Sequence, residues 1–124
     1  EPYTGFSSRI QAVVPMYGVH DLLALAQSRD QLSSFSDGEK ELCRQASAVN
    51  HLTKDDPPFL ILHGTKDTLV PVEQSELLMA ALQQGNVPAE ILIIEGAPHS
   101  FHLQPRQQDL RSTVLGFFDR HLKP

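Results

Sequence analysis

The sequence has a single cysteine and no long apolar run, and each of these features excludes a class of protein. Because Cys43 is alone, neither an internal disulfide nor a thiolate metal site can form. No apolar stretch approaches the roughly 20 residues needed to cross a bilayer, so no membrane span is predicted. Ten basic and 15 acidic residues give a net charge of −5 without runs of one sign, which argues against a nucleic-acid-binding protein.

The length of 124 residues is typical of one domain with one core. We therefore expect residues 1–124 to form a single α/β domain. The sequence opens with Glu1 instead of methionine, so we expect the parent protein to continue upstream of it. No compartment is predicted.

Three short apolar runs have the pattern of buried parallel strands. They are continuous rather than alternating and are bounded by turn residues. The runs are IQAVVPMYG (residues 10–18), PFLILHG (58–64) and AEILIIEG (89–96).

Segments between and after these runs carry helical periodicity. Residues 72–84 and 107–122 place apolar side chains at spacings of three and four. Asp21 can cap a short helix over LLALAQ, and residues 39–49 can form another. Strands that alternate with helices predict an α/β fold, a three-stranded parallel sheet flanked by helices.

Polar side chains gather in the two loops that follow the second and third predicted strands. Asp67 lies three residues after Gly64, and His99 lies three residues after Gly96. In an open parallel sheet, catalytic groups collect beyond the carboxyl ends of the strands. We therefore expect a carboxylate beside an imidazole, the arrangement that fixes a histidine tautomer during acyl transfer.

The two loops resemble the acid and histidine loops of the α/β-hydrolase fold, in its esterase, lipase and prolyl-oligopeptidase-like branch. The motifs are H-G-x-x-D-x-x-V-P (residues 63–71) and, about thirty residues later, G-x-x-H-x-F (96–101). The flanking sequence is similar, more narrowly, to small carboxylesterases that include acetyl-xylan and feruloyl esterase-like enzymes. The resemblance covers essentially the whole chain and implies Asp67 as the triad acid and His99 as the triad base.

A nucleophile is missing from the sequence. The family places its serine on a G-x-S-x-G elbow ahead of the acid and the histidine, and no such elbow is present. Ser7 lacks the second glycine, Ser75 lies inside a predicted helix, and Ser100 adjoins the base. The oxyanion-hole donors that the family takes from upstream loops are missing as well.

The resemblance also implies that the chain is the carboxyl-terminal third to half of the fold. The family's sheet has eight strands, of which this chain would supply the last three. Residues 10–16 would then present an unpaired edge, which invites pairing with another chain. We expect a homo-oligomer, or pairing with the missing amino-terminal part.

The remaining polar candidates have weaker signals. His99 and His102 have a spacing found in metal sites, but no third ligand is evident, so no metal ion or cofactor is predicted. His63 is expected to end its strand as a packed, hydrogen-bonded residue. His20, Asp21 and His102 are weak candidates for substrate binding, and helix capping explains Asp21 equally well.

The resemblance implies part of a serine hydrolase that cleaves carboxylic esters of small molecules through a Ser-Asp-His triad, of which only Asp67 and His99 are in this chain. The chain alone is expected to be inactive, because triad members act as a unit. Two alternatives stay open: a peptidase of the prolyl-oligopeptidase type, and a non-enzymatic fragment that associates with itself or a partner.

Overall fold

Two parallel strands form the centre of the computed structural model, which describes residues 4–123. Strand β1 covers Phe59–Gly64 and strand β2 covers Ala89–Ile94. The pairing runs in register from Phe59 opposite Ala89 to Gly64 opposite Ile94. Both strands therefore end at the same edge of the sheet, as the sequence predicts for a parallel pair.

Four α-helices surround the strands. They are α1 (Leu22–Ser28), α2 (Asp37–Ala46), α3 (Glu73–Gln84) and α4 (Arg111–Leu122), with single 3-10 turns at Leu32–Ser34 and Ala48–Asn50. Each predicted helical segment overlaps one of the α-helices, although α2 begins two residues earlier and ends three residues earlier than predicted, and α4 begins four residues later. Within residues 4–123, no helix combines the length and apolar composition that a membrane span requires.

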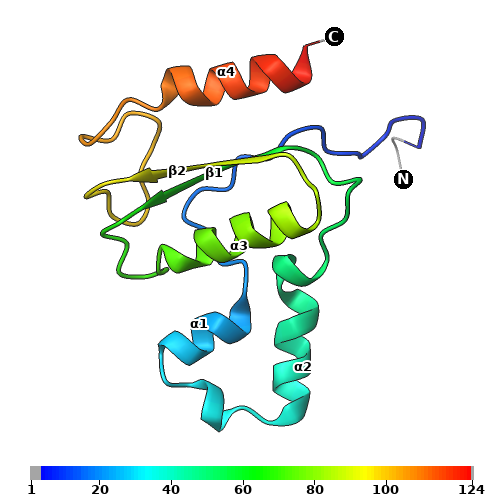
Figure 1. The fold of residues 1–124 in the computed structure, drawn as a ribbon, viewed down its shortest axis with the longest axis vertical. Coiled ribbons are helices and arrows are strands. Elements are labelled where there is room, and N and C mark those ends of the chain that lie inside the picture. Colours follow the sequence, from blue (N-terminus) through cyan, green and yellow to red (C-terminus); the bar gives the residue numbers. More distant parts are fainter. Residues whose placement is uncertain (1–3, 124) are drawn as a thin grey trace.

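The helices cover the two faces of the sheet in separate layers. Figure 1 shows α4 on one side of β1 and β2 and α3 on the other, with α1 and α2 beyond α3. Successive residues of a strand point to opposite faces. Leu60 and Leu62 accordingly join the apolar cluster that includes Phe117 of α4, whereas Ile61 packs with Leu78 and Leu82 of α3.

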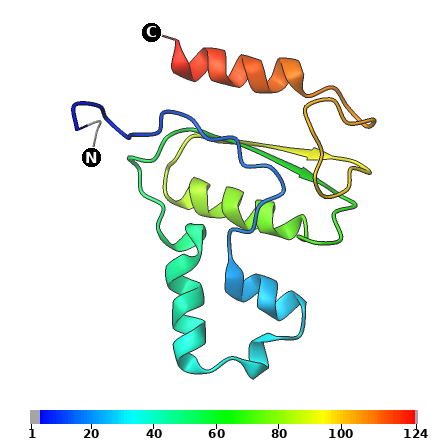
Figure 2. The same cartoon turned by 180° about the vertical axis from the view of Figure 1, so that it is seen from behind.

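The prediction of a third strand over residues 10–18 is wrong in detail. This segment runs parallel to β1 (Figure 2), but it forms only two isolated bridges, Val13 with Phe59 and Met16 with Leu62. Pro15 lies between them and has no N–H to donate to β1, so the ladder is interrupted. Its carbonyl still accepts from the Leu62 amide at 3.0 Å. The segment thus occupies the position of a strand without being one.

Candidate active site

The loops that follow β1 and β2 are joined by backbone and side-chain hydrogen bonds. The Thr65 amide donates to the Ile94 carbonyl at 3.1 Å, and the Lys66 amide donates to the Ala97 carbonyl at 3.0 Å. The Gly96 amide donates to Oγ1 of Thr65 at 2.8 Å. These contacts fix the two loops relative to each other at the carboxyl edge of the sheet.

Gly64 permits the loops to approach this closely. A Cβ atom at this position would lie 2.1 Å from the Ala97 carbonyl oxygen and 2.6 Å from its carbon. Both atoms belong to the backbone and cannot rotate away. Glycine is therefore required at the end of β1 for the second loop to reach its place.

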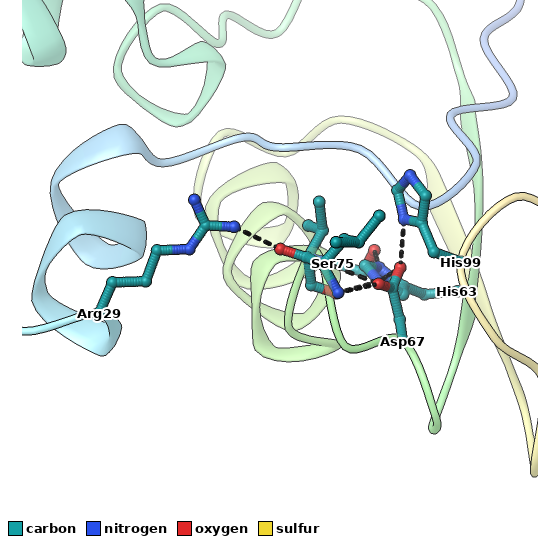
Figure 3. Close-up of polar contacts among 7 residues, drawn as sticks. Arg29, His63, Asp67, Ser75 and His99 are labelled. Carbon is teal, nitrogen blue, oxygen red and sulfur yellow. Dashed lines mark hydrogen bonds and ion pairs between the residues drawn. The ribbon is translucent and has the colours of Figure 1, made fainter.

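Asp67 and His99 meet where the two loops converge (Figure 3). Nδ1 of His99 donates to Oδ2 of Asp67 at 2.7 Å. The Asp67 side chain is fully buried, whereas that of His99 is 24% exposed. Nε2 of His99 has no hydrogen-bond partner within the described part of the chain, and it lies on the side of the ring away from Asp67. This geometry leaves Nε2 able to accept a proton.

Four donors surround the Asp67 carboxylate. Oδ1 accepts from the amides of Leu69 and Val70 at 2.9 and 2.8 Å, and Oδ2 accepts from His99 and from His63. Burial raises the pKa of Asp67, but hydrogen bonds from Val70, His99 and Leu69 and the charge of His99 together hold it below the ordinary 3.8. Asp67 is therefore an anion that can stabilise an imidazolium.

Tyr17 contacts the ring of His99 from the segment beside β1. The ring centroids lie 4.8 Å apart with an interplanar angle of 61°, an edge-on contact of the kind that aromatic rings prefer. Tyr17 has a φ of 44° and Ser100 has a φ of 61°, both in the left-handed region that non-glycine residues seldom adopt. Two of the four non-glycine residues with positive φ in the described part of the chain thus adjoin His99, while Asp30 and Asn86 have the same feature elsewhere.

His63 is buried and hydrogen-bonded, as the sequence predicts. Its side chain is fully inaccessible, and Nε2 approaches both Oδ2 of Asp67 at 3.0 Å and the Val70 carbonyl at 2.9 Å. Nδ1 lies 2.6 Å from Oγ of Ser75 in α3. The Asp67 carboxylate therefore contacts two imidazoles, not one.

His102 lies outside this group of hydrogen bonds. It is exposed, and its Nδ1 accepts from the Gln104 amide at 3.0 Å. Among residues 4–123, no three histidine, cysteine, aspartate or glutamate side chains are grouped so as to hold a metal ion. Substrate contact by His102 stays a prediction.

His20 and Asp21 lie at the start of α1 and are held there by Gln74 of α3. Oε1 of Gln74 accepts from both backbone amides at 2.9 Å, and Asp21 caps α1 by accepting from the Ala24 amide at 3.0 Å. The structure therefore gives Asp21 the capping role. Substrate contact by either residue stays a prediction.

The buried His20 should make the protein less stable in mild acid. His20 is 9% exposed, and its Nε2 has no hydrogen-bond partner among residues 4–123. Burial lowers the pKa of His20 from 6.5 to about 4, with the nearby His63 acting in the same direction. As the pH falls, the His20 side chain of the unfolded chain is protonated before that of the folded chain. The contribution of neutral His20 to the free energy of unfolding is therefore fully present above pH 6.5 and is lost as the pH falls to about 4. We expect a loss of about 3 kcal/mol over this range, measured by urea unfolding.

His20→Gln tests the assignment and His102→Gln serves as the exposed control. The His20 variant should lose most of the slope between pH 6.5 and 4, and the His102 variant should keep it. The depressed pKa of Asp67 acts in a lower window, since its contribution is present above 3.8 and is lost as the pH falls through the lower folded value. Equal slopes in all three proteins would contradict the role given to His20.

Two of these polar residues were not predicted from the sequence. Gln74 and Ser75 are polar residues in the first turn of an amphipathic helix, where exposure is the usual expectation, yet both are buried. A signal was available, because Ser75 and Gln74 lie three and four residues before Leu78 and thus belong to the buried stripe of α3.

Residues 4–124 match the model of the prolyl oligopeptidase family. A similar curated protein, the probable carboxylic ester hydrolase LipM of Mycobacterium tuberculosis, is 32% identical over 77% of this chain and 25% of its own length. The chain thus spans about a quarter of that relative.

Two solved structures are similar in fold, and both neighbours have the α/β-hydrolase fold. A truncated carbohydrate esterase from gut microbiota is 24% identical with a TM-score of 0.75, over 92% of this chain and 43% of its own. A puromycin-hydrolyzing peptidase of Mycobacterium tuberculosis is 26% identical with a TM-score of 0.74, over 91% of this chain and 18% of its own.

Proposed function

Since the chain belongs to the prolyl oligopeptidase family, we propose that Asp67 and His99 are the acid and the base of a Ser-Asp-His triad that cleaves carboxylic esters. The observation that carries the proposal is the 2.7 Å hydrogen bond from Nδ1 of His99 to the buried Asp67 carboxylate, which accepts hydrogen bonds from four groups in all. The chain is part of an α/β-hydrolase of the esterase and peptidase type. The similarity of the chain to LipM supports esters as substrates.

The roles follow from the direction of the hydrogen bonds. With its proton on Nδ1, His99 presents the lone pair of Nε2, which takes the proton of a serine hydroxyl as Oγ forms a bond to the ester carbonyl carbon. Collapse of the tetrahedral intermediate breaks the bond to the alcohol oxygen, which leaves with the proton from Nε2. Water then repeats the sequence on the acyl-enzyme and releases the acid. Asp67 stays ionised throughout and stabilises the imidazolium.

The serine of the triad lies, in this proposal, outside the 124 residues. Ser75 is fully buried and bonds to His63 instead of His99. Ser100 follows the base directly in a left-handed conformation, and Ser7 lies in an exposed amino-terminal stretch. None of these three serines has the strand-to-helix turn that exposes a nucleophile.

Two alternatives are supported by particular observations. Peptide amides are favoured by the family description and by the puromycin-hydrolyzing relative. A self-associating module without activity is favoured by the outer edge of residues 10–18, which pairs with no other segment of residues 4–123, and by the exposed Ile10.

A fluorophosphonate serine probe separates these functions. We expect no labelling and no hydrolysis of short-chain aryl esters by the chain alone. A longer protein that joins it to a G-x-S-x-G segment should be labelled and should cleave aryl esters faster than prolyl peptide amides. Light scattering on the same samples measures the mass, for which self-association predicts a multiple of 13.8 kDa. Labelling of the chain alone would overturn the assignment of the nucleophile.

A further inference from the structure

Two imidazoles share a single oxygen of Asp67. Oδ2 is 2.7 Å from Nδ1 of His99 and 3.0 Å from Nε2 of His63, while Oδ1 is occupied by the amides of Leu69 and Val70. The triad role of Asp67 requires only the contact with His99. The contact with His63 is therefore unexplained by the proposed chemistry.

The alternation of β1 determines where His63 points. Leu60 and Leu62 face the α4 layer, and Ile61 faces α3, so His63 is on the α3 side as well. Ser75 in the first turn of α3 meets it there at 2.6 Å, and both side chains are inaccessible to water. The pair is buried within protein and is out of reach of a substrate.

The partners of His63 fix the position of its proton. The Val70 carbonyl and the ionised Asp67 carboxylate can only accept, so Nε2 of His63 carries a proton and donates to both. In the neutral imidazole, Nδ1 then accepts from the hydroxyl of Ser75. Ser75 therefore donates to His63, and His63 donates to Asp67, with every polar atom of the buried imidazole satisfied.

We propose that His63 and Ser75 are positioning residues that hold Oδ2 of Asp67 toward His99 and thereby keep His99 in its Nδ1–H tautomer. The two amides anchor Oδ1, and His63 is the only other group besides His99 among the described residues that anchors Oδ2. Without His63, the carboxylate loses the donor that keeps it in place when His99 moves. The catalytic consequence rests on the proposed function, whereas the effect on the tautomer does not.

Nitrogen NMR of the histidine rings in the 124-residue chain tests this proposal without turnover. In the unchanged chain His99 should be a single Nδ1–H tautomer. His63→Leu, which has no donor, should give a mixture of both tautomers and exchange of the Nδ1 proton with water at least tenfold faster. His63→Gln places an amide N–H near the position of Nε2 and should restore the single tautomer. Ser75→Ala should accelerate the exchange by a few fold only.

The outcomes separate positioning from packing. If His63 only fills space, His63→Leu and His63→Gln will leave the tautomer and the exchange rate of His99 unchanged, and the proposal is then wrong. If His63→Leu does not fold, the comparison rests on Ser75→Ala and His63→Gln, and unchanged exchange in Ser75→Ala overturns the proposal. The serine-probe experiment decides the triad role independently, because tautomer and exchange are measured without a nucleophile.

Discussion

Asparagine in place of Asp67 should lower kcat for ester hydrolysis about 10⁴-fold in a longer protein that supplies the nucleophile. The amide oxygen can still accept from Leu69 and Val70, so the loop keeps its shape. The amide nitrogen then replaces Oδ2 and directs its hydrogens at the N–H groups of His63 and His99. The repulsion between the two N–H groups is relieved when His99 carries its proton on Nε2 instead of Nδ1. Nε2 then has no lone pair to accept the proton of the serine hydroxyl.

Steady-state kinetics with a short-chain aryl ester measure this effect. The KM should stay within a few fold, because Asp67 is buried and cannot touch the substrate. Lys66→Ala is a control from the same loop, since Lys66 is exposed and, among the described residues, is not a hydrogen-bond or ion-pair partner of Asp67 or His99. An Asp67→Asn enzyme that retains a tenth of the activity would contradict the triad role of Asp67.

Alanine in place of Gly64 should destabilise the protein by about 4 kcal/mol, above the usual range for overpacking. The added Cβ would overlap the carbonyl group of Ala97, and relief requires the loop after β2 to move away from β1. That movement breaks the hydrogen bond from the Lys66 amide to Ala97 and separates His99 from Asp67. Urea unfolding monitored by circular dichroism gives the change in the free energy of unfolding.

Gly38→Ala is the matched control for this substitution. Gly38 lies in the first turn of α2, where an added Cβ meets no atom within 4 Å. Because alanine favours helix over glycine, this variant should be unchanged or up to about 1 kcal/mol more stable. Similar stabilities for the Gly64 and Gly38 variants would indicate that the loops adjust freely, contrary to the geometry at Ala97.

The sequence predicts the sheet and its covering helices where local patterns decide the structure. The continuous apolar runs that form β1 and β2 and the periodic stripes of α3 and α4 contain enough information for this. Pro15 shows the limit of such patterns. Its run is as apolar as the others, but strand formation depends on a donor that proline lacks. The run therefore lies beside β1 without a continuous ladder.

The pairing of Asp67 with His99 could be expected because both follow glycines at the ends of parallel strands. The contribution of Ser75 could not. Its spacing from Leu78 indicates that it is buried, but whether its hydroxyl meets His63 depends on how α3 is rotated about its axis, which the spacing does not determine. The contact between Gly64 and Ala97 is likewise a matter of how closely two loops approach, which sequence spacing leaves undetermined.

The order β1, α3, β2 along the chain has a consequence for folding. Asp67 and His99 are separated by 32 residues, and the strands that carry them are joined by one crossover through α3. Bringing the pair together therefore requires the closure of a single loop of moderate length, whose entropic cost grows only slowly with length. His63 in β1 and Ser75 in α3 are 12 residues apart and belong to the same β1–α3–β2 unit. The carboxylate, both imidazoles and the hydroxyl can thus assemble as one contiguous folding unit, before residues 10–18 align beside it.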